Sequence, residues 1–544
     1  MSFGGRMRMY ARFGLGLPAF FRRRMGPGEA THIIRRRLKE RDTAFLRLLQ
    51  RAVFANDGNP YLSLFRLAGY DAGDVRAMVA RRGLEDALRA LCESGVYVTF
   101  EEFKGRRPLV RKGQKVPVEP EDFDNPHLRH YYGSRTSGST GRPTRVSMDL
   151  DHLAYQLPVR LLTFHAHGFL GVPTILWRAT LPVSSGVSNA LRFPLMGNRV
   201  LQWFTPISPA GLGQKPIHRM ATEYIVLASR LCGVAIPRPE PLPLTDPMPL
   251  LRAALKARRR AGKCLISCPV SLAVRACLAA ADAGITLDEM AFTGAGEPPT
   301  RAKVAAIRQA GASYIPNYAS SETGTIAAAC ARPADGSDVH LASDLAVLTE
   351  APRQVPGWQT TVNAFHVTTL SPAAPKLMIN VSLDDYGVLE KRKCGCPLGA
   401  LGYDTHVRCV RSYGKLTGQG MTLINSDLER VLEERLPEQF GGGPQDYQLA
   451  EEEGEDGLTR LVLRISPTVR LEDEREVAQA LLRNVNAMGH AGRYAALVWG
   501  KDHSVEVRRV APVWTCSGKL LPLAPPGGRG AAGSFTRDRQ EERV

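Results

Sequence analysis

Three features are scarce or missing in this sequence. Cysteine accounts for only 10 of 544 residues, at irregular spacings, which excludes a secreted disulfide scaffold and favours a reducing compartment. No apolar run reaches the ~20 residues that a membrane-spanning helix needs, so we expect a soluble, cytoplasmic protein without a transmembrane segment. Aromatic residues make up 7%, and few lie among the basic residues, so the net charge of +18 does not predict a nucleic-acid partner.

The first 25 residues are basic around a short apolar run from Phe13 to Phe21. This run is too short to span a bilayer, and no small-residue cleavage site follows it. We expect a solvated helical lead-in, with a peripheral contact to lipid as the alternative. The arginines concerned are Arg6, Arg8, Arg12, Arg22, Arg23 and Arg24.

The sequence also lacks the Gly-Lys-Ser/Thr of a P-loop, although it has a loop of hydroxyl residues and glycines. Glycine permits positive φ and a close backbone approach, so N–H groups and hydroxyls can converge on a phosphate. We therefore expect an anion-binding loop, and a flexible Ser/Gly linker is the alternative. The loop consists of Thr136, Ser137, Gly138, Ser139, Thr140 and Gly141.

At this length, two to four domains are expected. The segment from 217 to 311 alternates helices and strands, which predicts a parallel, helix-covered sheet. Apolar periodicity predicts further helices at 31–54 and 74–94, and the stretch 106–125 has the composition of a loop. The expected helices of the alternating segment are 219–231, 250–261, 271–283 and 299–310, with strands at 264–267 and 289–293.

Beyond Tyr314 the sequence becomes richer in strands, with segments 361–370 and 376–381 alternating or wholly apolar. A last compact unit is predicted from helices at 426–436 and 473–488 and strands at 458–465 and 504–513. The fold class is thus α/β: a large domain with helix-covered sheets and a β-rich subdomain, followed by a small α+β domain. We place the divisions at 1–57 (a basic helical extension), 58–410, 411–523 and 524–544, the last expected to be disordered.

Six short stretches occur in the order and spacing of the adenylate-forming superfamily, which the chain resembles. This superfamily contains acyl-CoA synthetases, the adenylation domains of peptide synthetases, and luciferases. The stretches are the glycine loop, Thr293 to Pro298, Tyr318 to Gly324, Asp385 to Gly387, Arg411 leading to Gly420 and Glu429, and Trp514 to Leu520. Within the superfamily the chain is most similar to phenylacetate-CoA ligases, through Asn59-Pro60-Tyr61, Thr144 after Gly-Arg-Pro, and His366 to Leu370 with Cys394-Gly395-Cys396 downstream.

The resemblance implies an ATP-dependent ligase that forms an acyl-AMP, releases pyrophosphate and passes the acyl group to coenzyme A. Its implied requirements are ATP, Mg²⁺ and a small carboxylic acid, with an aromatic acid as a family-level expectation. A carrier protein or an amine is the alternative acceptor, and an inactive scaffold that acts as a binding protein is the alternative of another class. A homodimer also remains open.

The resemblance also implies a role for each motif residue. Thr136, Ser137, Gly138, Ser139, Thr140 and Gly141 would bind the β- and γ-phosphates, and Glu322 would hold Mg²⁺. Tyr318 would stack on adenine beside Gly296 and Glu297, Asp385 or its neighbour Asp384 would bind the ribose, and Arg411 would contact ribose or phosphate. Lys519 would reach the α-phosphate when the mobile small domain closes about a hinge at Tyr413-Gly414-Lys415.

A structural zinc site is a further implication of the resemblance. Its ligands would be Cys330, His340, Cys394 and Cys396, with Cys409 as an alternate, because Cys₃His is an accepted tetrahedral set. Four unrelated residues are the competing interpretation. The acid itself cannot be read from the sequence: the expected pocket region, 176–206, contains Trp177, Arg178, Trp203 and Phe204, which do not match the phenylacetate pattern.

Overall fold

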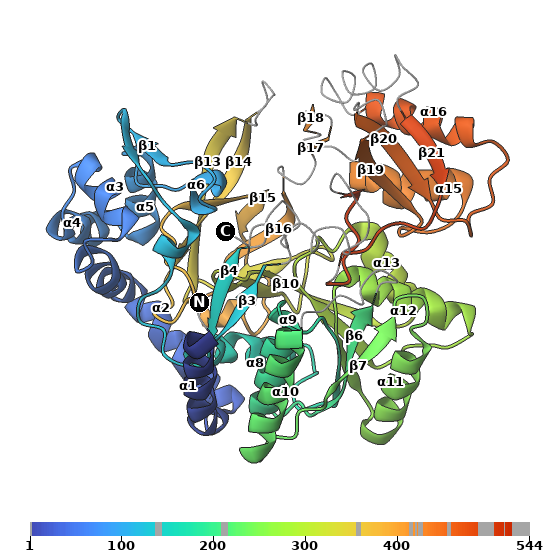
Figure 1. Ribbon diagram of the computed structural model, residues 1–544, viewed down its shortest axis with the longest axis horizontal. Helices are drawn as coiled ribbons and strands as arrows, with labels where there is room; N and C mark the ends of the chain where they lie inside the picture. The colour runs from blue at the N-terminus through green and yellow to red at the C-terminus, as the bar shows by residue number, and fades with distance from the viewer. Residues whose placement is uncertain are drawn as a thin grey trace.

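The computed structural model describes residues 3–136, 144–207, 216–354, 361–412, 417–418, 421–422, 428–453, 459–487, 505–515 and 517–524. Figure 1 shows a small α+β unit, in orange and red, at one side of a much larger α/β body. This arrangement confirms the predicted fold class. Within the described ranges, no helix combines the length and apolarity needed to cross a membrane.

A single large sheet organises the large body and, among the described residues, contains twelve strands in the order β13-β14-β15-β16-β12-β11-β10-β9-β8-β5-β6-β7. The strands from β10 to β7 pair in parallel, and those from β10 to β13 pair antiparallel. Their bounds are β5 Thr174–Trp177, β6 Val200–Ile207, β7 Pro239–Pro243, β8 Cys264–Ser267, β9 Met290–Gly294, β10 Ser313–Ser320, β11 Gly324–Ala329, β12 Val339–Leu341, β13 Ala346–Gln354, β14 Thr361–Thr369, β15 Val381–Lys391 and β16 Thr405–Ser412.

Both faces of the inner parallel strands β5, β8 and β9 are buried, which explains their nearly continuous apolar sequences, whereas the edge strand β7 is mostly exposed. In β5, for example, Leu176 belongs to one apolar cluster while Ile175 and Trp177 belong to the other. One face is covered mainly by α8, α9 and α10, and the other by α11, α12 and α13. The covering helices are α7 Leu150–Tyr155, α8 Leu157–Ala166, α9 Ser185–Arg192, η3 Phe193–Met196, α10 Pro216–Leu231, α11 Met248–Ala261, α12 Val270–Asp282 and α13 Arg301–Gln309.

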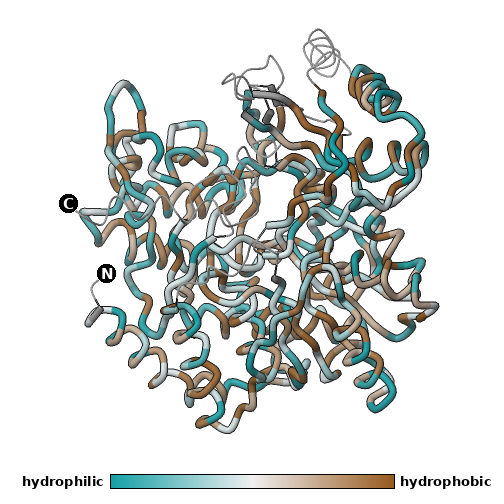
Figure 2. The backbone as a smooth tube through the Cα atoms, turned by 45° about the vertical axis from the view of Figure 1, so that its right-hand side comes forward, coloured by the Kyte–Doolittle hydropathy of each residue, from teal (hydrophilic) through white to brown (hydrophobic). Residues whose placement is uncertain are grey.

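The antiparallel half packs against helices and short strands from the N-terminal part of the chain. Figure 2 shows hydrophilic and hydrophobic residues alternating along many of the peripheral helices, as expected where one side faces the core. These elements are α2 Pro27–Leu49, η1 Gln50–Phe54, α3 Pro60–Ala68, α4 Ala72–Arg82, α5 Leu84–Glu93, α6 Phe100–Phe103, β1 Leu109–Arg111, β2 Gln114–Val116 and η2 Pro120–Phe123. The hairpin β3 Tyr131–Arg135 and β4 Arg145–Asp149 belongs instead to the apolar cluster of α8 and α9, and a short 3₁₀ helix, η4 Gly399–Leu401, precedes β16.

The N-terminal helix α1, Phe3–Phe21, is not the solvated lead-in that its arginines suggested. Phe13, Leu17 and Phe20 are fully or almost fully buried in the same apolar cluster as α8 and α9. Phe13 also packs edge-on against Tyr132, with ring centroids 5.5 Å apart. Burial of these three large apolar side chains stabilises the docked helix, while its arginines remain in water on the outer face.

Three local expectations were wrong. The helix expected over 74–94 is two helices, because Gly83 adopts φ +76° and ends α4 before α5 begins. The helix expected from Pro299 begins after Thr300, whose hydroxyl accepts from the Lys303 amide as an N-cap. The segment 376–381 is not a strand up to Val381, since Lys376 makes only an isolated bridge to Asp124.

The small C-terminal unit packs helices on a sheet of four described strands, in the order β21-β20-β19-β22. Leu428, Leu449, Leu463 and Leu481 lie at its fully buried core. Its elements are β17 Thr417–Gly418, β18 Met421–Thr422, α14 Leu428–Arg430, η6 Val431–Arg435, α15 Leu436–Phe440, β19 Tyr447–Glu453, β20 Thr459–Ile465, α16 Glu474–Asn486, β21 Val505–Arg509 and β22 Leu523–Ala524.

Candidate active site

Two neighbouring cavities lie at the carboxyl ends of the parallel strands, where ligands bind in open α/β sheets. One, of about 190 Å³, includes Arg178 just after β5 and Ser267 at the end of β8; we call it the arginine-lined cavity. The other, of about 140 Å³, is the tyrosine-lined cavity. Gly296, Asn317 and Ala319 belong to both walls, so a ligand extending from one cavity into the other would pass these residues.

The tyrosine-lined cavity gathers five residues that the resemblance assigned to the nucleotide: Gly296, Glu297, Tyr318, Asp385 and Arg411. The Tyr318 hydroxyl donates to Asp385 Oδ2 at 2.9 Å. Burial, together with the nearby Asp385 carboxylate, raises the pKa of Tyr318. The structure therefore places Asp385 in this wall, whereas its neighbour Asp384 is not among the residues described as lining it.

Lys519 lies where the two cavities meet. Its Nζ donates to the Gly296 carbonyl at 3.0 Å, although the two residues are 223 positions apart. The turn before it is held by Gly518 at φ +75° and by the Lys519 amide, which donates to Thr515 Oγ1 at 2.9 Å. The small domain is thus docked with this lysine at the wall of the arginine-lined cavity.

Glu297 helps to fix that docking. Its carboxylate accepts from both the amide and the hydroxyl of Ser271, each at 3.0 Å. It also accepts from the Leu520 amide at 2.8 Å, one residue beyond Lys519. A second contact joins the domains nearby, because Lys303 and Glu433 form a buried ion pair at 2.7 Å. Burial alone would lower the pKa of Lys303, but the Glu433 carboxylate raises it above its ordinary value.

Glu322 is buried and does not line either cavity in the part of the chain that is described, although Ser320 and Ser321 line the arginine-lined one. Its Oε1 instead accepts from Lys104 Nζ at 2.7 Å. Burial opposes ionisation, but the Lys104 ammonium more than compensates and holds the pKa of Glu322 below its ordinary value. Glu322 is therefore a carboxylate with a lysine as its partner.

Of the glycine loop, Ser137, Gly138, Ser139, Thr140 and Gly141 lie outside the described residues, as do the expected hinge at 413–415 and the tail at 525–544. Thr136, the first loop residue, is described. Its amide donates to the Thr144 carbonyl at 2.9 Å, and its hydroxyl accepts from the Thr144 amide at 3.0 Å. These bonds clamp the two ends of the loop together above the β3–β4 pair.

The expected zinc ligands lie together at one end of the antiparallel half. His340 Nε2 is 3.0 Å from Cys396 Sγ and 3.6 Å from Cys394 Sγ, and ligand atoms of Cys330, His340 and Cys394 lie within 4.8 Å of one another. His340 Nδ1 donates to the Tyr403 carbonyl at 2.7 Å, which leaves Nε2 free to act as a ligand. The Cys330 thiol first, and His340 next, hold the pKa of Cys396 far below its ordinary value.

His406 joins this cluster although no motif pointed to it. It belongs to the same ligand group as Cys330, His340 and Cys394, and its ring lies 4.1 Å from that of His340 between centroids. Its Nδ1 pairs with Asp338 at 2.6 Å, and its buried Nε2 has no hydrogen-bond partner in the described structure. Only the pairing of β12 with β16 brings the two histidines together.

The arginine-lined cavity also contains residues that the motifs did not identify, chiefly Arg160 on α8 and Arg192 at the end of α9. The sequence contained a signal for the first: Arg160 interrupts the otherwise apolar run Leu157 to Leu162. A charged residue in the middle of a buried helix is unusual unless it has a partner.

No protein-family model matches this chain, and no curated protein does. Among solved structures, it is similar to ATP-bound MatB from Rhodopseudomonas palustris, with 12% identity over 72% of this chain and 66% of that chain and a TM-score of 0.38. It is also similar to the anthranilate CoA ligase AuaEII in complex with anthranoyl-AMP, with 12% identity over 80% and 74% and a TM-score of 0.43. The chain spans about two thirds of the length of the first.

Proposed function

We propose that this chain is an ATP-dependent carboxylate ligase of the adenylate-forming kind. The observation that supports this most is the position of Lys519, whose ammonium bonds the Gly296 carbonyl where the two cavities meet. ATP would place its adenosine in the tyrosine-lined cavity and its α-phosphate at this junction. The acid would approach from the arginine-lined cavity.

In the first half-reaction, a carboxylate oxygen of the acid attacks the α-phosphorus. The bond from that phosphorus to the oxygen bridging to the β-phosphorus breaks, and pyrophosphate leaves with its electron pair. The step brings two anions together, so the cation at the junction lowers its barrier. Lys519 suits this role because its ammonium donates to the neutral Gly296 carbonyl, a contact that a phosphate oxygen can replace.

The other residues of the tyrosine-lined cavity would hold the nucleoside. Tyr318 offers an aromatic face for adenine, and the Asp385 carboxylate can accept from the ribose hydroxyls. Arg411 would contact ribose or phosphate. The loop from Thr136 to Gly141 would gather the β- and γ-phosphates with its amides and hydroxyls.

Glu322 fits Mg²⁺ in chemistry, because it is a carboxylate held in the ionised form. When bound, the ion would neutralise part of the charge on the phosphates. Lys104 occupies the carboxylate at 2.7 Å, so this ammonium would have to share or leave Glu322. Its neighbours Ser320 and Ser321 already line the cavity where the phosphates would arrive.

In the second half-reaction, a thiol attacks the acyl carbonyl and AMP leaves. We propose coenzyme A as the acceptor, with the small domain (411–523) moving on the large one (58–410) about residues 413–415. A carrier-protein thiol or an amine is the alternative, because both acceptors share the first half-reaction. An acid of the phenylacetate type rests on the sequence resemblance alone.

We also propose a structural zinc ion bound by Cys330, His340, Cys394 and Cys396. The support is the convergence of their ligand atoms and the tautomer of His340 that the Tyr403 carbonyl favours. Elemental analysis of the purified protein should find about one zinc per chain. Cys396→Ala should lose the metal and unfold at a lower temperature, whereas a full complement of zinc in Cys396→Ala would contradict this ligand set.

The experiment that tests the proposed function is ATP–pyrophosphate exchange with a broad panel of carboxylic acids. We expect exchange only when a suitable acid is present. Competition among coenzyme A, a carrier protein and amines as acceptors would then identify the second half-reaction. Absence of exchange with every acid would favour the inactive scaffold.

A further inference from the structure

The wall of the arginine-lined cavity is unusual in its charge. Its described residues include five cations and no aspartate or glutamate. Lys519 is assigned above to the reacting phosphate, and Arg135 is exposed at the end of β3. Arg160, Arg178 and Arg192 are between 7% and 9% exposed, so three buried guanidinium groups remain to be explained.

Arg160 is the least satisfied of the three. One terminal nitrogen donates to Asn189 Oδ1 at 3.2 Å, and its buried Nε has no partner among the described residues. Burial, followed by the charges of Arg192 and Arg178, lowers the pKa of this guanidinium well below its ordinary value. Because arginine stays protonated in proteins, burial disfavours this cation unless an anion reaches it.

Arg192 and Arg178 also lack a carboxylate partner in the described structure, but they differ in how well neutral groups satisfy them. Arg178 donates to Ser267 Oγ and to the carbonyls of Cys268 and Thr293, which explains it as a brace between β8 and β9. Among the described residues, Arg192 donates to the Ser188 carbonyl at 3.2 Å and to Gln156 Oε1 at 3.4 Å. Arg160 and Arg192 thus retain donors for a ligand.

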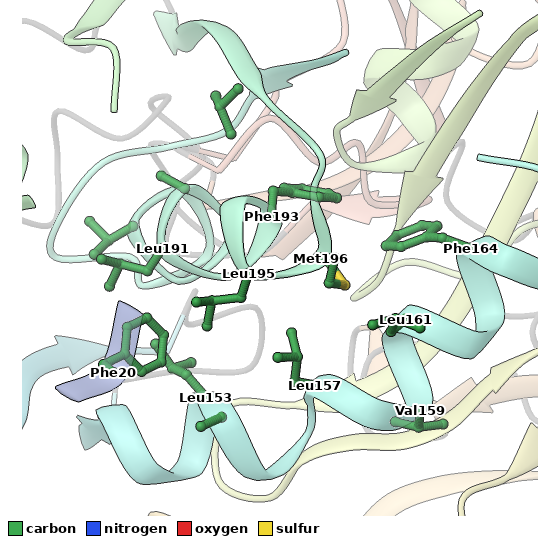
Figure 3. Packing of buried hydrophobic residues seen from close by; sticks show 14 of the residues in the cluster. Phe20, Leu153, Leu157, Val159, Leu161, Phe164, Leu191, Phe193, Leu195 and Met196 are labelled. Carbon is green, nitrogen blue, oxygen red and sulfur yellow. The ribbon is translucent and has the colours of Figure 1, made fainter. Parts of the chain in front are cut away.

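Arg160 and Arg192 lie on α8 and α9, two helices with mostly buried side chains. Leu157 and Leu161 on α8 and Leu191 on α9 belong to one apolar cluster with Leu195 and Met196, which Figure 3 shows. A buried guanidinium costs several kcal/mol unless an anion pairs with it. Guanidinium groups also match carboxylate geometry better than any other cationic side chain does.

On the basis of the proposed function, we infer that the acid substrate carries a second anionic group, bound by Arg160 and Arg192. Its first carboxylate faces Lys519 at the junction, while the second lies deeper in the arginine-lined cavity. A dicarboxylate is the simplest such acid. A monocarboxylic acid with an apolar tail would leave both arginines buried without an anion.

The test measures ATP–pyrophosphate exchange with each diacid from malonate to adipate and with its monomethyl ester. A further compound is the analogue of the preferred diacid in which a sulfonate replaces the second carboxylate. We expect the preferred diacid to exceed its ester by roughly 30-fold or more in kcat/KM, as for removal of a buried charge partner. The sulfonate, if used, would support a binding site for anions in general. Equal or better use of the esters would overturn the inference while leaving the proposed function intact.

Arg160→Met keeps the length of the side chain without its charge, and Arg252→Leu removes an exposed arginine on α11 as the control. We expect Arg160→Met to abolish the preference for the diacid and Arg252→Leu to retain it. Arg160→Lys, which keeps a cation, should retain part of the preference and serves if the methionine variant does not fold. An increased KM for ATP with an unchanged diacid preference would mean that these arginines bind phosphate, and would overturn the inference.

If no acid supports exchange, the proposed function fails. Calorimetric titration of each diacid and of its monomethyl ester into the protein then tests the second anionic group by binding alone. Tighter binding of a diacid than of its ester, lost in Arg160→Met, would support it. Equal or undetectable binding of both would overturn it.

Discussion

The two cavities share part of a wall but differ in charge. The tyrosine-lined cavity contains Glu297, Asp385 and Glu429 along with Lys303 and Arg411, so its acidic and basic groups can balance each other. The arginine-lined cavity has five cations and no described acid. A balanced pocket is suited to an uncharged base and sugar, whereas an unbalanced one is complete only with an anion. The charge of the arginine-lined wall therefore indicates an anionic ligand, whereas the charges of the tyrosine-lined wall do not.

The largest effect is expected at the junction. Lys519→Ala removes the cation that is proposed to contact the α-phosphate at the junction and should lower kcat/KM for acid-dependent exchange by about 10²–10³, the usual cost of a lost transition-state donor. Lys256→Ala, which removes an exposed lysine on α11, should leave exchange unchanged. Wild-type exchange in Lys519→Ala would contradict the role of the junction.

The tyrosine-lined cavity is tested through Asp385→Asn. This change weakens the acceptor for the ribose hydroxyls and should raise KM for ATP by roughly 10-fold or more, since hydrogen bonds to charged groups contribute about 1.5–3 kcal/mol. The KM for the acid should change little. If the acid were affected more than ATP, the two cavities would have been assigned the wrong way round.

Glu322, which lies next to the residues of the arginine-lined cavity, should make the stability of the protein depend on pH. Its pKa is lowered in the folded protein, so its contribution to stability is complete above the unfolded value of about 4.3 and is lost as the pH falls through the folded value. Glu322→Gln should therefore be destabilised at pH 7, and in urea unfolding it should approach the wild type only as the pH falls below about 4.3 towards the lower folded value. Glu472→Gln, an exposed control, should show no such convergence.

The smallest effect is expected on thermal stability, through the arginine-lined cavity. Arg160→Met removes a buried, poorly paired charge and should raise the unfolding midpoint by a few degrees in the absence of ligands. Thermal unfolding by circular dichroism would measure this. A marked decrease would mean that Arg160 supports the fold and has its partner in the protein itself.

The alternation of strands and helices between 217 and 311 allowed β8 and β9 of the parallel half to be predicted, because both strands are buried and largely apolar, whereas the mostly exposed edge strand β7 was missed. The β8 bounds agree with the prediction, and β9 is shifted by one residue. Boundaries failed where a single residue decided them, as at Gly83, whose backbone conformation no apolar period reveals.

The motifs predicted that Tyr318, Asp385, Lys519 and Glu322 lie at one site; the structure brings the first three to the walls of the two adjoining cavities, whereas Glu322 lines neither in the described part of the chain. No motif identified Arg160, Arg192 or His406, because their positions at these sites arise from tertiary packing. Each lies on an ordinary helix or strand, and only the packing of α8 on α9, or of β12 beside β16, brings them to the site.

The central claim, formation of an acyl-AMP at the junction, is tested most directly by isotope transfer. The preferred acid, labelled with ¹⁸O in its carboxylate groups, is incubated with ATP and the acceptor, and the AMP is analysed by mass spectrometry. Because a carboxylate oxygen becomes the bridge to the α-phosphorus and stays there when the acyl group leaves, we predict AMP carrying one labelled oxygen. Unlabelled AMP, or label in inorganic phosphate with release of ADP, would contradict the account.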